Sequence, residues 1–227
     1  NGRLARQITR GDWNVSNFLG YDAQSGSYFY ESNQEGALYK AIYKMNAKGV
    51  ETKLSTLKGT NTAEFNPSCT YFINRYSSVD EPLVVTVCDA RGKTLRTLED
   101  NASLKALAAQ SGLPQKEFFT CANAAGDLMN GYILKPANFD PSKRYPVVMS
   151  QYSGPGSQSV LDNWKVDWEY YLANQGFIVA CVDGRGTGGR SRAYETAVYM
   201  QLGKYETEDQ VAGAEYMSTL PYVDGNR

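Results

Sequence analysis

The stretch FIVACVDGRGTGGR, residues 177–190, carries the clearest fold signal in this chain. Its first six residues, Phe177–Val182, are mostly apolar and β-branched, which is typical of a strand buried on both faces. The glycines that follow, Gly184, Gly186 and Gly189, have the spacing G-x-G-x-x-G. In dinucleotide-binding proteins such a loop follows a strand and holds the pyrophosphate. The stretch therefore predicts an α/β fold and raises the question of whether the loop binds a nucleotide.

The residues around the glycines disfavour a nucleotide site. A dinucleotide loop needs a helix that begins inside it, so that the helix N-terminus faces the phosphates. Here the segment after Gly189 starts with polar residues and is broken by Gly203, and the strand ends in Asp183, where phosphates would approach. Glu206 or Asp209 lies about 20 positions on, as the motif asks, but acidic residues also favour the start of a helix. A nucleotide-binding oxidoreductase that uses GRGTGG stays an alternative.

The residues on either side extend the α/β pattern. We predict helices over 101–112, 162–174 and 207–220, a hairpin of 117–122 with 128–134, and buried strands over 145–150 and 177–182. Asn101 is expected to cap the first helix, and Thr207 to open the last one in a capping box with Gln210. Two buried strands joined through a helix form a βαβ unit. The second half is therefore expected to hold a mainly parallel sheet.

The first hundred residues follow a different pattern. Short runs rich in aromatic and β-branched residues alternate with turn signals, over 27–32, 37–45, 71–76 and 82–88. Helical periodicity is missing here. Short, regularly spaced strands predict a sandwich or the blades of a β-propeller, with the aromatic residues in the core.

Composition excludes several classes of protein. The net charge is -1 over 227 residues, so no basic face argues for nucleic acid, and no apolar run approaches the length of a membrane span. Cys69, Cys88, Cys121 and Cys181 are widely spaced, which favours small buried residues over a zinc site. The chain has no histidine. Because a Ser-His-Asp or Cys-His site needs an imidazole, the missing histidine is an objection that any hydrolase interpretation must answer.

Seven short motifs, in order along the whole chain, resemble dipeptidyl peptidase IV and its bacterial relatives in the prolyl oligopeptidase group of serine peptidases. The motifs are GDW (11–13), LEDN (98–101), KRYPVV (143–148), QYSGPGSQ (151–158), DGRGTGG (183–189), ETEDQ (206–210) and PYVDGNR (221–227). The resemblance implies a mixed fold: the C-terminal part of a β-propeller, followed by the first half of an α/β-hydrolase domain. It assigns residues 1–100 to the last propeller blades and residues 101–227 to the N-terminal half of the catalytic domain.

The resemblance also explains the glycine-rich loop and the absence of histidine. It implies that DGRGTGG is a tight turn after a strand of the hydrolase sheet, with Arg185 as a structural ion-pair or carbonyl partner. In the family the nucleophile elbow G-x-S-x-G, and then the Asp and His of the triad, follow the segment similar to PYVDGNR. No G-x-S-x-G occurs in this sequence. The chain is therefore expected to be an internal fragment, with the triad after Arg227 and the propeller glutamates that hold the substrate amino terminus before Asn1.

One catalytic element of the family matches a residue of this chain. By its place in QYSGPGSQ, Tyr152 is expected to donate its hydroxyl to the oxyanion of the tetrahedral intermediate. The resemblance further implies peptide substrates with Pro or Ala at the second position, no cofactor and no metal. It also implies a possible homodimer of the full-length protein and a periplasmic or otherwise extracytoplasmic location.

Three departures from the animal enzyme favour a bacterial relative. Gly156 and Tyr76 stand where that enzyme has cysteines, and Lys165 stands where an arginine is expected, so a carboxylate contact there should be weaker. Dipeptidyl and tripeptidyl substrates both stay open. A non-catalytic binding module remains the third interpretation of the chain.

Overall fold

The structure, a computed structural model, describes residues 2–226; Asn1 and Arg227 lie outside the described residues. It contains three four-stranded sheets. The strands of the first two sheets are β1 (Val15–Asp22), β2 (Ser27–Ser32), β3 (Ala41–Met45) and β4 (Glu51–Lys53), then β5 (Thr60–Phe65), β6 (Tyr71–Ser78), β7 (Glu81–Asp89) and β8 (Thr94–Glu99). The remaining elements are α1 (Ala102–Gln110), β9 (Lys116–Ala122), β10 (Leu128–Leu134), β11 (Val147–Met149), α2 (Trp168–Asn174), β12 (Ile178–Asp183), α3 (Arg192–Thr196) and α4 (Tyr205–Ser218).

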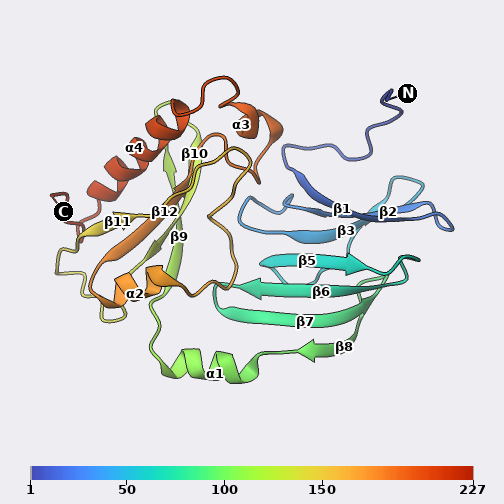
Figure 1. The fold of residues 1–227 in the computed structure, drawn as a ribbon, viewed down its shortest axis with the longest axis horizontal. Coiled ribbons are helices and arrows are strands. Elements are labelled where there is room, and N and C mark those ends of the chain that lie inside the picture. Colours follow the sequence, from blue (N-terminus) through green and yellow to red (C-terminus); the bar gives the residue numbers. More distant parts are fainter. Residues whose placement is uncertain (1, 227) are drawn as a thin grey trace.

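The first two sheets are antiparallel meanders that lie one above the other (Figure 1). Each strand pairs with the next one along the chain, which is the arrangement that short strands with tight turns produce. Phe29 and Ile42 of the first sheet share a buried cluster with Ala63 and Phe72 of the second. The aromatic runs of the first hundred residues therefore form strands with a common core, as the sequence predicts.

The third sheet has the order β11-β12-β10-β9, and here one prediction is wrong. Only β11 and β12 are parallel; β12 with β10 and β10 with β9 are antiparallel. The sheet of the described residues is therefore mixed rather than mainly parallel. The reason is the hairpin of β9 and β10, which must be antiparallel because its turn is so short. The βαβ unit of β11, α2 and β12 is confirmed.

Strand β12 is buried along its whole length and separates two helices. Ile178 and Ala180 contact Met217 of α4, whereas Val179 contacts Tyr170 of α2. Successive side chains of a strand point to opposite faces, so α4 covers one face of the sheet and α2 the other (Figure 1). This three-layer arrangement explains why residues 177–182 form an unbroken apolar run.

The helices exist where the sequence predicts them, but their caps differ. Asn101 is the N-cap residue of α1, as predicted, yet with a φ of 49° its side chain makes no cap bond; its Nδ2 donates to Leu83 O at 2.6 Å instead. Helix α2 begins only at Trp168, because Asp167 caps it by accepting from the Glu169 N–H at 3.0 Å. Asp167 also pairs with Lys165 Nζ at 3.0 Å, so Lys165 does have a carboxylate contact.

Helix α4 shows that the predicted capping box is wrong. The helix begins at Tyr205, and Thr207 lies within its first turn, with its Oγ1 donating to Gly203 O at 2.7 Å. Lys204 is the N-cap residue, no side chain caps the helix, and Glu206 in the first turn accepts from the Gly203 N–H at 3.0 Å. The Gln210 side chain points into the protein and contacts Val182 and Ser153.

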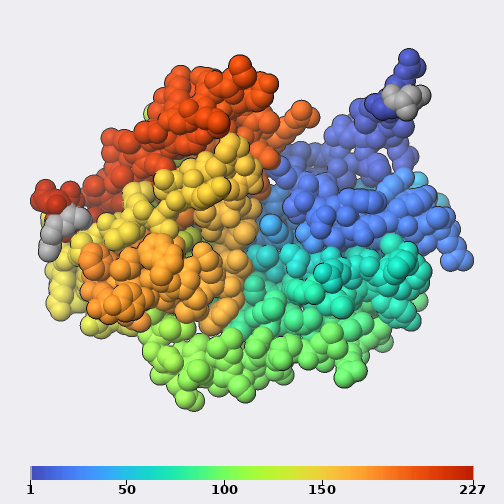
Figure 2. Space-filling model, viewed as in Figure 1, coloured from blue at the N-terminus to red at the C-terminus, as the bar shows by residue number. Residues whose placement is uncertain are grey.

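The two halves of the chain meet along one continuous boundary (Figure 2). Residues 150–167, between β11 and α2, supply most of the polar contacts across it. Asp162 Oδ1 accepts from the Val79 N–H at 2.8 Å, its own N–H donates to Leu38 O at 2.9 Å, and its carbonyl accepts from Thr60 Oγ1 at 2.9 Å. Gln158 Nε2 donates to Ala37 O. The same segment carries Tyr152.

All four cysteines are buried and free, and three of them lie in strands β7, β9 and β12. This confirms their interpretation as small buried residues. No helix within residues 2–226 is both long and apolar enough to cross a membrane.

Candidate active site

Tyr152 lies just beyond the carboxyl end of β11. The Ser150 N–H donates to Ala180 O at 2.8 Å, which continues the pairing of β11 with β12 almost to Tyr152. The Tyr152 side chain is 76% exposed. Its ring lies against Gly154, where an added Cβ would come within 2.5 Å of Tyr152 Cε1. The phenol is therefore free to donate its hydroxyl to a ligand, on a backbone that the sheet holds in place.

The glycine-rich turn holds the loop that carries Tyr152. The Gly156 N–H donates to Gly186 O, and the Gly188 N–H donates to Ser157 O, both at 2.8 Å. Gly186 has a φ of 92°, which glycine adopts without strain, and an added Cβ at Gly188 would lie 2.9 Å from Gly156 O. The glycines thus permit a close approach between two backbones.

Backbone N–H groups that a phosphate would need are already used within the protein. The Arg185 N–H donates to Asp209 Oδ2 at 2.6 Å, the Gly186 N–H to Tyr194 O at 2.9 Å and the Gly188 N–H to Ser157 O. The next helix, α3, begins only at Arg192. The turn therefore lacks the geometry of a dinucleotide loop, in which a helix N-terminus and free N–H groups face the pyrophosphate.

Asp183 links the end of β12 to the loop of Tyr152. Its carboxylate accepts from the Ser159 N–H at 3.0 Å and from the Val160 N–H at 2.7 Å, and the residue is 6% exposed. Burial raises the pKa of Asp183 to about 6, although these two N–H donors act in the opposite direction. The Asp183 carboxylate, whose charge disfavours phosphate binding, thus serves as a hydrogen-bond acceptor within the fold.

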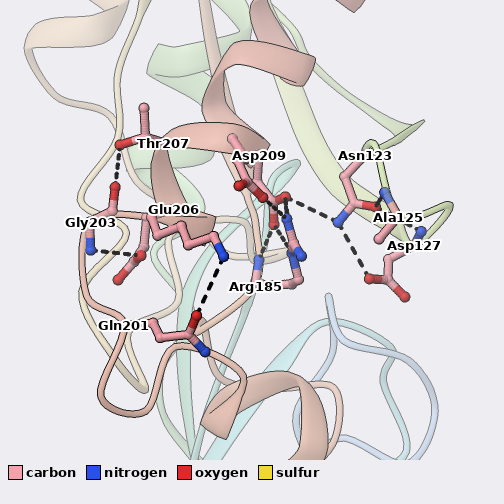
Figure 3. A network of polar contacts seen from close by, with 11 residues as sticks. Asn123, Ala125, Asp127, Arg185, Gln201, Gly203, Glu206, Thr207 and Asp209 are labelled. Carbon is pink, nitrogen blue, oxygen red and sulfur yellow. Dashed lines mark hydrogen bonds and ion pairs between the residues drawn. The ribbon is translucent and has the colours of Figure 1, made fainter.

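Asp209 is the centre of a buried polar network between three elements (Figure 3). Its carboxylate, fully buried, accepts from Arg185 Nη2 at 2.7 Å and Nε at 3.1 Å, and from Asn123 Nδ2 at 3.1 Å. Arg185 Nη2 also lies 3.1 Å from Glu208 Oε2. The network joins the turn after β12, the start of α4 and the β9–β10 hairpin. Arg185 is a structural ion-pair partner, as expected.

An apolar groove of 740 Å³ lies beside the same loop. Pro155 and Gly156 form one wall, and Val198, Tyr199 and Leu202 are among the residues of the other. Tyr199 and Leu202 are 77% and 70% exposed, respectively. The loop that carries Tyr152 therefore borders a groove with exposed apolar side chains.

Chemically, the described residues offer a hydrogen-bond donor rather than a complete catalytic centre. Tyr152 is the one site residue that the sequence predicts. The structure places it on the surface, and Gln210 donates to the side chain of the next residue, Ser153. Within residues 2–226, no group of three or more His, Cys, Asp or Glu residues is arranged to hold a metal ion. Sequence analysis missed Gln210 because a Gln three residues after a Thr also fits a capping box.

Comparisons with known proteins agree with this arrangement. Residues 1–83 match the family model of the dipeptidyl peptidase IV N-terminal region, and residues 164–227 match that of the prolyl oligopeptidase family. Among curated relatives, a probable dipeptidyl peptidase 4 of Aspergillus flavus is 30% identical and is matched over 96% of this chain and 29% of its own length. A probable dipeptidyl-aminopeptidase B of Metarhizium robertsii is 31% identical over 97% of this chain and 25% of its own length.

Solved structures show the same likeness in three dimensions. The dipeptidyl peptidase 4 of Porphyromonas gingivalis superposes with a TM-score of 0.93 at 48% identity, over 98% of this chain and 32% of that protein. A putative dipeptidyl aminopeptidase IV of Bacteroides ovatus superposes with a TM-score of 0.84 at 30% identity, over 96% of this chain and 31% of that protein. The chain thus spans less than a third of the length of these relatives.

Proposed function

The chain belongs to the dipeptidyl peptidase IV family, in the prolyl oligopeptidase group, and we propose that the complete protein is a serine exopeptidase that releases N-terminal dipeptides. On this proposal, residues 1–100 are propeller blades and residues 101–227 begin the α/β-hydrolase domain. The serine, aspartate and histidine of the triad belong to parts of the protein outside this sequence. The preferred substrates are peptides with Pro or Ala at the second position.

Tyr152 is the proposed oxyanion donor of that reaction. The serine oxygen adds to the substrate carbonyl as its proton passes to the histidine, and the carbonyl oxygen becomes an oxyanion. Collapse then expels the amine of the leaving peptide, which takes that proton from the histidine as an acyl-enzyme forms. Water then releases the dipeptide. A phenol hydroxyl aimed at the oxyanion stabilises both tetrahedral states and need not move during the reaction.

The observation that carries this proposal is the place of Tyr152. It stands at the carboxyl end of a strand in a mixed α/β sheet, largely exposed, on a loop fixed by backbone bonds to the turn 183–189. Ligands of such folds bind beyond the carboxyl ends of the strands. The likeness to the relatives runs through both sides of this loop, with 98% of the chain superposed on the Porphyromonas gingivalis structure.

Labelling the full-length protein with a fluorophosphonate tests the reaction class. An activated serine is expected to give one covalent adduct in the intact mass, and the adduct should abolish cleavage of Gly-Pro-p-nitroanilide. Mass spectrometry of products from longer peptides then separates release of dipeptides from release of tripeptides. No adduct and no hydrolysis, in a folded full-length protein, would contradict the proposal and favour a non-catalytic module.

An extracytoplasmic location and a homodimer are further proposals, supported only by the family resemblance. Fractionation of the source cells tests the first, and light scattering of the full-length protein tests the second.

A further inference from the structure

Gln210 connects three parts of the molecule through one side-chain amide. Its Nε2 donates to Val182 O at 2.8 Å, near the end of β12, and to Ser153 Oγ at 3.1 Å, in the loop that carries Tyr152. Gln210 itself lies on α4, one residue beyond Asp209. A single NH₂ group therefore ties the helix, the central strand and the loop of Tyr152 together.

The contacts fix which way the amide faces. Val182 O is a carbonyl and can only accept a hydrogen bond, so the NH₂ group and not the oxygen must face it. The Gln210 Oε1 is buried and has no hydrogen-bond partner among the described residues. Burying an unpaired polar atom lowers the stability of the folded protein, because the atom loses its hydrogen bonds to water. The Gln210 side chain therefore lowers the stability of the fold through its unpaired oxygen. This favours a functional role for its amide group.

Ser153 transmits this contact directly to Tyr152. Ser153 has a φ of 53°, in the left-handed region that non-glycine residues seldom adopt. Such a conformation persists when surrounding contacts hold it, and the Gln210 amide supplies one of them. Because Ser153 is bonded to Tyr152 through the chain, a change in its φ redirects the phenol.

We propose that Gln210 is a positioning residue that, through Ser153, holds the Tyr152 hydroxyl in its catalytic direction. This inference rests on the proposed oxyanion role of Tyr152. The network around Asp209 supports it, because it fixes the first turns of α4 against the end of β12 and so keeps the Gln210 amide in place. Gln210 acts here through Ser153 and need not contact the substrate.

The test is a double-mutant cycle in the full-length protein. Ser153→Ala removes only the hydroxyl that Gln210 contacts, keeps the Cβ, and leaves the bond from Gln210 to Val182 O intact. Gln210→Met removes both bonds at similar side-chain volume. Each is compared with Tyr152→Phe and with the double variants, using kcat and KM for Gly-Pro-p-nitroanilide. Glu215→Gln, an exposed change on the same helix, is the matched control.

Ser153→Ala and Gln210→Met are each expected to lower kcat roughly tenfold, with KM changed less than about twofold, since the misplaced group acts in the transition state. In the Tyr152→Phe background the same changes should have almost no further effect on kcat. Glu215→Gln should match the wild type.

The outcomes separate this inference from the proposed function. If Tyr152→Phe leaves kcat unchanged, the oxyanion role itself is wrong. If Tyr152→Phe lowers kcat but Ser153→Ala does not, or if the losses multiply in the double variants, Gln210 is a structural residue only and the positioning inference is overturned. Circular dichroism of every variant identifies any that fails to fold, and Ser153→Ala keeps the test decisive if Gln210→Met is one of them.

Discussion

Asp183 is a residue at which a buried carboxyl group serves structure rather than chemistry. Two backbone N–H groups stabilise its charge, yet burial outweighs them and its pKa lies near 6. The folded state therefore binds this proton more tightly than the unfolded chain does. As a result, the stabilising contribution of Asp183 is complete below about pH 4 and is lost as the pH rises through 6.

The direction of this pH dependence gives a prediction for Asp183→Asn, because the asparagine side chain stays neutral at every pH. The free energy of unfolding of the variant, relative to the wild type, should rise from pH 4 to pH 7 by on the order of 3 kcal/mol, from a shift of about two pKa units. Urea denaturation of the full-length protein at several pH values measures the difference. A difference that is flat, or that falls with pH, would show that Asp183 has an ordinary or lowered pKa in the folded state.

Among the elements, the turn after β12 and the start of α4 are joined by the buried ion pair of Arg185 with Asp209. Arg185→Met leaves a fully buried carboxylate without its cation and should destabilise the protein by about 3–5 kcal/mol. The double variant Arg185→Met with Asp209→Asn should lose less than the sum of its two single changes. Thermal and urea unfolding of the four proteins provide the comparison.

The control for this junction is Arg75→Met, which breaks the exposed pair of Arg75 with Glu64. That change should cost less than about 1 kcal/mol, because water screens the pair. If Arg75→Met and Arg185→Met lower the free energy of unfolding equally, the buried network does not stabilise the fold more than an exposed ion pair does.

The sequence was sufficient to locate elements but not to describe how each begins. Residues 27–32 are rich in aromatic residues and follow a turn signal, as is typical of a short strand, and β2 has those bounds. Asn101 and Thr207 have the residue types of helix caps, yet Leu83 and Gly203 compete for their side chains. These competing acceptors come from tertiary or local folding that residue type alone does not reveal.

The same limit applies to the candidate site. The motif predicts Tyr152, since the loop sequence is specific. The sequence assigns Gln210 to a capping box, because nothing in it shows that β12 and the loop of Tyr152 come within reach of the Gln210 amide. The antiparallel hairpin beside β12 was visible in the sequence, but its place in the sheet order was not.

For the molecule as a whole, Asp162 joins the first two sheets to the α/β part. Asp162→Ala removes the acceptor of the Val79 N–H and leaves that group unpaired at the boundary, which should cost about 1–3 kcal/mol. Hydrogen exchange at Val79 should accelerate by at least about tenfold. Lys143→Ala, at an exposed loop pair, is the control and should leave exchange at Val79 unchanged. Unaltered protection in Asp162→Ala would show that this contact does not hold the boundary together.

Tyr152 is the proposed oxyanion donor of a serine exopeptidase. The most direct measurement is the steady-state hydrolysis of Gly-Pro-p-nitroanilide by the full-length protein and by its Tyr152→Phe variant. Loss of one oxyanion donor is expected to lower kcat by about 100-fold, roughly 3 kcal/mol, with KM nearly unchanged. A Tyr152→Phe variant that keeps its kcat within about threefold of the wild type would contradict the account.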